Sequence, residues 1–421
     1  SNATTLTGAG ANLIFDEQGT AESPSIHIDG VKGSGVTFVL AANDGLLQTS
    51  FLDLGTDSTE GSHTVEVTLP SPPAEGEDIK VQFATDASGK LAFEAGNSIS
   101  DAGLWITTPE LESRANKTGG KDWFITNITA DPAPTPISMI DGLQSNYFFW
   151  RSMYDSTRER FGELRKGVDA GLWGRITAGS LSYGSIDTTY QTYRLGLDAA
   201  ITENIRTGFM IERYEGNLKG NGGKGDMGAT TVALYGLYIS PEGYYADAGV
   251  RFGLMDYDYA NNSLLPDAYD YQTSAVSGWL EVGKDFSLSK NFFVNPHVAF
   301  AYGRLSSEDF TTRNGLSATT DAVDSAIFTL GTDFGLRNET LEVAFTADFM
   351  HEALGDQTIT VQGLESSLTE EISYSDSWAE YGLSFAYRPE DTLNVWLNLR
   401  RSAFSEVDRD WRINAGLRWS Y

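Results

Sequence analysis

The feature that most constrains this chain is an alternation of apolar and polar residues that recurs from residue 171 to residue 421. In the segment 393–400 every odd position is Leu or Val, while the even positions are Asn, Trp, Asn and Arg. A period of two puts successive side chains on opposite faces of a β-strand. We predict about twelve strands, near 171–184, 188–201, 205–217, 226–240, 243–258, 271–286, 290–305, 322–337, 340–353, 374–387, 391–403 and 410–421.

The number and spacing of these strands favour a transmembrane β-barrel. Each strand with its connection has about 21 residues, which fits membrane strands of about 10 residues plus loops. A mean hydropathy of -0.26 is compatible with this, because barrel strands alternate lipid-facing and lumen-facing residues. Short turns also alternate with longer loops, as expected for opposite faces of a membrane. The predicted longer loops are 217–226, 258–270, 306–322 and 354–374.

Composition narrows the possible function. The net charge of -29 argues against a nucleic-acid partner, because phosphate binding needs a basic surface. The chain has no cysteine, and its His351-Glu352 pair lacks the second histidine of a zinc motif. No Gly-x-Ser-x-Gly elbow surrounds a serine. We therefore expect no metal, no cofactor and no enzymatic activity.

Three segments precede the strand series. Residues 4–130 hold short alternating stretches between turns, which predicts stacked β-structure. Residues 131–140 are proline-rich and predict an extended linker. Residues 141–167 predict an α-helix, because Asp141 and Gln144 resemble a capping box and apolar residues recur at steps of three and four. A cationic stripe repeats every seven residues on this helix, at Arg151, Arg158 and Arg165.

The segment RERFGELRKGVDAGLWGRITAG, residues 158–179, resembles the junction between helix and barrel in type Va autotransporters. The family's helix motif matches Arg160, Gly162, Glu163, Leu164 and Arg165. Its first-strand motif matches Gly171, Trp173 and Arg175. The resemblance covers residues 141–421. It extends more weakly to residues 60–130, where Trp123, Phe124 and Ile125 resemble the end of a pertactin-like passenger.

The resemblance implies an all-β fold with a twelve-stranded antiparallel transmembrane barrel at 171–421 and a lumenal helix at 141–167. Residues 4–130 would be the β-helix-like end of a passenger, with an autochaperone region. The implied function is an outer-membrane translocation unit of type V secretion, which exports its own passenger to the surface of a Gram-negative cell while the helix plugs the pore. Implied partners are outer-membrane lipid, the barrel-assembly machinery, periplasmic chaperones and the passenger itself; we expect a monomer.

The helix stripe is expected to face lumenal carboxylates, and a solvated helix face is the alternative. The candidate carboxylates are Asp198, Glu212, Glu281, Glu342, Asp348 and Glu380. Some family members cut their own chain between two adjacent asparagines of the helix. The aligned positions here are Asp155 and Ser156. We therefore expect an uncut chain with a tethered passenger.

The final segment, DWRINAGLRWSY at 410–421, predicts the strand that closes the barrel against the first strand near Trp173. Its apolar face would meet lipid, while Arg412, Asn414 and Arg418 would face the lumen. In the family an aromatic C-terminus is the assembly signal, most often Phe or Trp, and Trp419 and Tyr421 hold that place here.

Two other interpretations stay open from the sequence. The chain would be an outer-membrane pore, or a barrel enzyme active at its rim near His351. Alternatively, it would be a soluble β-rich adhesin domain, since single alternating strands also occur in soluble sandwiches.

Overall fold

The computed structural model describes residues 6–7, 12–14, 25–42, 51–71, 80–154, 170–221, 223–261, 268–390 and 392–420. The chain divides into two compact units. The N-terminal unit consists of Ser1–Ile137, Arg313–Ser317 and Val361–Leu368. The second unit consists of Ser138–Thr312, Ala318–Thr360 and Thr369–Tyr421.

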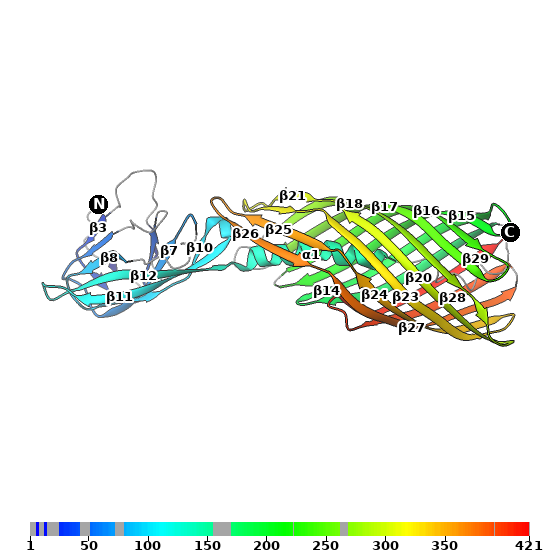
Figure 1. Ribbon diagram of the computed structural model, residues 1–421. Helices are drawn as coiled ribbons and strands as arrows, with labels where there is room; N and C mark the ends of the chain where they lie inside the picture. Colours follow the sequence, from blue (N-terminus) through cyan, green and yellow to red (C-terminus); the bar gives the residue numbers. More distant parts are fainter. Residues whose placement is uncertain are drawn as a thin grey trace. The chain divides into compact units, whose positions relative to one another are not determined.

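In the described part of the second unit, twelve strands form a closed antiparallel barrel (Figure 1). They are β13 (Ala170–Tyr183), β14 (Ile186–Ala200), β15 (Ile205–Gly220), β16 (Gly223–Ile239), β17 (Tyr244–Asn261), β18 (Ala268–Lys284), β20 (Phe292–Leu305), β23 (Val323–Arg337), β24 (Leu341–Glu352), β27 (Asp376–Glu390), β28 (Leu393–Ala403) and β29 (Asp408–Ser420). The predicted barrel is confirmed, and every predicted strand overlaps an observed one. A further short strand, β19 (Phe286–Ser287), pairs with β20.

The structure differs from the prediction at three of the expected longer loops. The expected loop at 217–226 is mostly strand, because β15 and β16 stay paired as far as Gly220 and Gly223. The expected loops at 306–322 and 354–374 contain four strands that form a separate sheet. These strands are β21 (Glu308–Thr311), β22 (Ser317–Thr320), β25 (Asp356–Gln362) and β26 (Ser367–Ser373). Side chains such as Ile359 and Val361 are fully buried and give this sheet a core.

The two ends of the barrel are built differently. At the short-turn end, which also holds Ala170 and Ser420, brief turns such as 240–243 and 338–340 join the strands. The opposite, long-loop end carries the four-stranded sheet between barrel strands. The alternation of apolar and polar residues in the sequence places apolar side chains on the outside of the barrel and polar ones inside. Leu195 and Leu330 expose 60% and 63% of their surface on the outside, whereas Arg194 is buried inside at 2%.

Glycines let large aromatic side chains lie flat against the inner wall. A Cβ added to Gly196 would come within 2.3 Å of the Trp173 ring, and one added to Gly249 would come equally close to Trp279. Such a distance is far below van der Waals contact, so only glycine fits beneath these rings. The glycines therefore set where lumenal aromatics can pack.

The described helix is α1 (Pro134–Met153), and its part within the second unit, from Ser138 onward, lies inside the barrel along its axis (Figure 1). It corrects two predictions. The expected linker at 131–140 is instead the end of β12 (Lys121–Pro132) followed by the first turns of α1. Proline is tolerated there, because the first N–H groups of a helix have no partner within the helix. The expected helix at 141–167 thus begins earlier, Tyr154 is not helical, and residues 155–167 lie outside the described residues.

The N-terminal unit contains parallel strands stacked as rungs, followed by an antiparallel end. One parallel sheet joins β2 (Asn12–Ile14), β5 (Thr37–Ala41), β7 (Gly61–Thr68) and β9 (Leu91–Ala95). The other sheet contains β3 (Ser25–Ile28), β6 (Phe51–Leu54), β8 (Val81–Asp86), β10 (Ser98–Ser100), β11 (Trp105–Ala115) and β12. A further pair joins β1 (Leu6–Thr7) and β4 (Val31–Lys32), and a short 3₁₀ helix covers Asp101–Gly103. Phe38, Phe83 and Phe93 lie in the shared core, with Trp123 edge-on to Phe93 at 5.1 Å.

This core contains a titratable side chain, which gives a first prediction. His63 is buried between Phe38 and Phe93, and its Nδ1 accepts the Val36 N–H at 3.3 Å. Burial lowers the pKa of His63 below its ordinary value of 6.5, so the folded unit holds it neutral. The unfolded chain binds the proton more readily, so stability is present above that value and is lost as the pH falls below it.

We expect the urea concentration that unfolds the N-terminal unit to fall between pH 7.5 and pH 5.5, scored by pulse proteolysis of the full chain. His63→Gln keeps an acceptor for Val36 but does not titrate, so its midpoint should fall less over the same range. An equal fall in parent and variant would contradict the assignment.

Candidate functional site in the barrel lumen

The lumen at the long-loop end is filled by helix. Every residue of α1 from Ser138 to Met153 is buried, although the helix carries many polar side chains. A helix buried on all sides must find partners for its polar groups from the surrounding wall. The barrel supplies these partners at three depths.

The outermost contacts hold the helix at the strand connections. The Asp141 carboxylate accepts the Asn221 backbone N–H at 2.9 Å and the Ser185 hydroxyl at 3.2 Å. Ser138 and Tyr259 share a hydrogen bond of 3.0 Å. One helix carboxylate thus joins the turn between β15 and β16 to the turn between β13 and β14.

The middle contact is made to Glu352, at the end of β24. This carboxylate is fully buried and accepts the Tyr147 hydroxyl of the helix at 2.8 Å. It also accepts the Ser325 hydroxyl and the Ala326 N–H, the latter at 2.6 Å. Tyr374 stacks on the Tyr147 ring at 4.0 Å. The sequence analysis had placed Glu352 only in a rejected zinc motif, although the alternation of β24 puts it on the same face as Asp348.

A group of stacked aromatic rings lines another side of the helix. The rings of Tyr257 and Tyr271 lie 4.8 Å apart, and those of Tyr269 and Phe310 lie 4.7 Å apart. The Tyr271 hydroxyl donates to the side-chain oxygen of Asn146. The Tyr269 hydroxyl donates to the Met139 carbonyl at 3.5 Å, so two of these rings satisfy polar atoms of the helix.

The innermost contact lies at the C-terminal end of α1. Arg251 of β17 donates to the Met153 carbonyl at 2.7 Å and pairs with Glu212 at 3.0 Å. Glu212 also pairs with Arg194, and all three side chains are buried. A cation at this end complements the helix dipole and satisfies a carbonyl that has no partner within the helix. Arg251 therefore fixes how deep the helix reaches.

Of the predicted arginine stripe, Arg151 alone lies among the described residues. Arg151 lies over the Trp378 ring at 3.8 Å and donates to Ser405 at 3.3 Å. Among the described residues it pairs with none of the six candidate carboxylates. The remaining predicted helix residues lie outside the described residues: Arg158, Arg160, Gly162, Leu164 and Arg165. So do Asp155 and Ser156.

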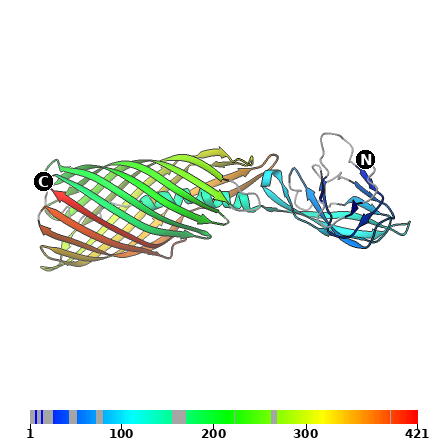
Figure 2. The ribbon, with the colours of Figure 1, turned by 180° about the vertical axis from the view of Figure 1, so that it is seen from behind.

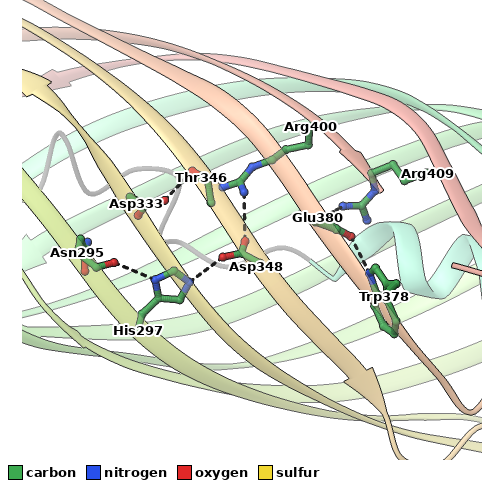
Figure 3. Close-up of polar contacts among 9 residues, drawn as sticks. All are labelled: Asn295, His297, Asp333, Thr346, Asp348, Trp378, Glu380, Arg400 and Arg409. Atoms are coloured by element: carbon green, nitrogen blue, oxygen red, sulfur yellow. Dashed lines mark hydrogen bonds and ion pairs between the residues drawn. The ribbon is translucent and has the colours of Figure 1, made fainter. Parts of the chain in front are cut away.

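The six candidate carboxylates have partners from the barrel itself, and five of them, all but Glu342, are buried. Figure 3 shows two of them, Asp348 and Glu380. The pairs, besides Glu212 with Arg194 and Arg251, are Asp198 with Arg418, Glu281 with Tyr245, Glu342 with Arg388, Asp348 with His297 and Arg400, and Glu380 with Arg409. These contacts join different strands. The predicted contacts of these carboxylates with Arg158 and Arg165 lie outside the described residues.

The predicted start motif lies where the barrel closes. Gly171, Trp173 and Arg175 are on β13, which pairs with β29 in the register Trp173 to Arg418 and Leu172 to Trp419. Trp173 and Arg175 point inward and are buried, whereas Trp419 exposes 65% of its surface outside. Tyr421 lies outside the described residues. The predicted pairing of the last strand with the first is confirmed.

The short-turn end encloses a cavity of about 1140 Å³. Its lining includes charged residues from successive turns and strand ends, among them Asp285, Arg337, Glu342 and Arg388. Within the described ranges, no cluster of side chains suited to a metal ion occurs. No described helix has the length and apolar character needed to span a membrane.

Comparison with known proteins agrees with this architecture. The family described as "Autotransporter beta-domain" matches residues 171–400. The serine protease EspC of Escherichia coli O127:H6 is 22% identical over 418 residues, which cover 96% of this chain and 31% of EspC. The pertactin autotransporter of Bordetella bronchiseptica is 25% identical, over 65% of this chain and 31% of its own length. The chain thus spans less than a third of these relatives.

Solved structures show the same fold. The beta domain of the Bordetella autotransporter BrkA aligns with a TM-score of 0.50 at 22% identity, over 60% of this chain and all of that domain. The translocator domain of NalP from Neisseria meningitidis aligns with a TM-score of 0.52 at 8% identity, over 66% of this chain and 97% of that domain. The family's match covers more than half of the residues of this chain, and the closed barrel observed here is the fold of these solved autotransporter domains. The chain therefore belongs to the autotransporters, and its barrel is an outer-membrane translocation unit.

Proposed function

We propose that this barrel exports the part of its own chain that precedes α1, and that α1 then remains in the lumen as plug and tether. The observation that supports this most is the complete burial of Ser138–Met153 among wall residues. The helix is held by hydrogen bonds at three depths, through Asp141, Tyr147 and the Met153 carbonyl. Such contacts match a segment that is retained rather than one that passes through.

Residues 4–130 are proposed to be the C-terminal part of the passenger, with an autochaperone role. Stacked parallel rungs fold by adding one rung to the next, so they need a stable first element. The antiparallel hairpin of β11 and β12 provides an end of this kind, because its pairing is local in sequence. In this proposal, β12 and the start of α1 replace the predicted linker at 131–140.

The long-loop end is proposed to face the cell exterior and the short-turn end the periplasm, as in other outer-membrane barrels. Outer-membrane lipid would contact the exposed apolar band. The barrel-assembly machinery would insert the barrel, periplasmic chaperones would deliver it, and the chain would act as a monomer. The aromatic C-terminus, with Trp419 and Tyr421, would be the assembly signal.

We propose that the chain itself has no enzymatic activity. Some relatives are named serine proteases, but this chain spans less than a third of them. The rim histidine His351 contacts Ser377 at 2.9 Å. In the described ranges, no carboxylate hydrogen-bonds to His351, so a Ser-His-Asp arrangement is incomplete there. Any activity of the whole protein would reside in other parts of it.

Export predicts a specific pattern of protease access on intact cells. A protease site inserted in the turn at 116–119 should be cut by added protease, because it lies in the proposed passenger. The matched site in the turn at 240–243 should resist until the outer membrane is permeabilised, because that turn would face the periplasm. Protection of the first site in cells whose barrel is folded would contradict the proposed export.

A further inference from the structure

The barrel has one seam at which strands distant in sequence must meet. At this seam β29, the last strand, pairs with β13, the first, from Gly171 and Ser420 to Ser182 and Asp408. Figure 2 shows the red C-terminal strand beside the green strands that begin the barrel. In every other pair of neighbouring barrel strands, one strand is the next barrel strand after the other along the chain. Closure therefore depends on this pairing.

One buried ion pair crosses the seam. Arg418 of β29 reaches over β13 to Asp198 of β14, with Nη2 and Oδ1 2.6 Å apart and Nη1 and Oδ2 3.4 Å apart. Arg418 is 1% exposed and Asp198 is 5% exposed. Two donors from one guanidinium to one carboxylate fix the distance and the orientation of both strands.

The Asp198 carboxylate gathers further strands at the same point. The Tyr235 hydroxyl of β16 donates to it at 3.1 Å, and the Trp173 indole N–H of β13 donates to the Tyr235 oxygen at 2.9 Å. Four strands thus meet around one carboxylate: β13, β14, β16 and β29. The predicted start-motif tryptophan belongs to this group.

Other wall ion pairs have the same chemistry but do not cross the seam (Figure 3). Arg409 of β29 pairs with Glu380 of β27 at 2.7 Å, and Arg400 of β28 pairs with Asp348 of β24 at 3.1 Å. Both join strands on the C-terminal side of the seam, so they can form before the barrel closes. Among the buried ion pairs of the described residues, Asp198 with Arg418 alone requires closure.

We propose that Asp198 and Arg418 form a seam clasp, a pair of positioning residues whose mutual pairing permits the first and last strands to close in this register. While the seam is open, water can solvate both charges. Closure buries them, which is tolerable only when each has its counter-charge. Loss of one partner should therefore penalise the closed barrel more than the open one. The clasp belongs to barrel closure alone and does not depend on passenger export.

The test uses engineered disulfides in the full chain, which has no native cysteine. The seam reporter combines Ile176→Cys and Ala415→Cys, direct partners across the seam. The control reporter combines Leu397→Cys and Ala415→Cys, direct partners within the hairpin of β28 and β29. Paired strand positions lie within the reach of a disulfide. Refolding into lipid under oxidising conditions then reports each contact separately.

With Asp198→Asn, we expect the seam disulfide to form about tenfold or more slowly, because closure then buries Arg418 without the carboxylate that accepts from its two terminal nitrogens. The hairpin disulfide should form at the parent rate. Arg400→Gln is the matched control, since it breaks a buried pair away from the seam and should spare the seam rate. Asp198→Arg combined with Arg418→Asp should restore much of the lost rate.

Three outcomes would overturn the clasp. They are an unchanged seam rate in Asp198→Asn, equal slowing of both reporters, and equal slowing by Arg400→Gln. If Asp198→Asn does not fold, Arg418→Lys, which keeps the charge but loses the forked contact, must still slow the seam reporter selectively. Failure of the clasp would leave the protease-access result on export unaffected, so the two proposals fail separately.

Discussion

Removal of residues 419–421 is expected to abolish assembly of the barrel in the outer membrane while leaving synthesis of the chain unchanged. Trp419 is paired on both sides, with Leu172 of β13 and Leu393 of β28. The Ser420 N–H also donates to the Thr392 carbonyl at 2.9 Å. Without these residues, backbone groups of both neighbours lose their partners at the membrane, where each unsatisfied group costs several kcal/mol.

The deleted residues also belong to the pairing of β29 with β13, which closes the barrel. No other strand can replace β29 in that pairing. Folded barrel should be measured as the band that shifts on heating in gel electrophoresis of outer membranes, against total protein in whole cells. A deletion of Ser1 to Ala3 is the control of equal length. Equal amounts of heat-shifted barrel in the two deletions would contradict the expected role of the last strand.

The barrel strands were predictable because each carries its own signal. In β28 and β29 the apolar face and the polar face can be read from a single strand, since the outer face must suit lipid and the inner face water and side chains. Turn residues then mark the strand ends. Hence the twelve predicted strands correspond to the observed ones, and the closing pair of Trp173 with Arg418 lies where it was expected.

Contacts between strands that are not adjacent were not predictable in this way. Arg418 meets Asp198 by passing over β13, and Arg409 meets Glu380 by passing over β28. Strand tilt and register decide which inward side chains come together, and a single sequence gives neither. Arg151, for example, lies over the Trp378 ring. The expected contacts of Arg158 and Arg165 with lumenal carboxylates stay a prediction, because both arginines lie outside the described residues.

Two local errors came from signals that have more than one meaning. Prolines 134 and 136 suggested a linker, but proline is also suited to the first turn of a helix. The glycine-rich segment at 219–225 suggested a long loop, whereas its strands remain paired up to a tight turn.

Glu352→Ala is expected to loosen the helix and open the pore. The carboxylate of Glu352 is the acceptor for Tyr147 of α1 and for Ser325 and Ala326 of the wall. Its removal leaves these three donors, and the part-buried Leu354 N–H, without this acceptor, at a cost of about 1–3 kcal/mol for each buried donor. If α1 moves out of its position in the lumen, water can enter and hydrogen-bond to these donors. This recovers part of the cost, so displacement of α1 becomes more favourable.

The measurement is ion conductance of the purified chain in planar bilayers, together with the sensitivity of cells to antibiotics too large for an intact outer membrane. Tyr147→Phe removes only the bond between helix and wall, so it should raise conductance in the same direction but by less. Ser325→Ala removes one wall donor to the same carboxylate while Glu352 stays in place, so it should raise conductance less than Glu352→Ala. Parental conductance in both Glu352→Ala and Tyr147→Phe would mean that Glu352 does not hold the plug. Retention would then rest on Asp141 at the outer contact and Arg251 at the inner one.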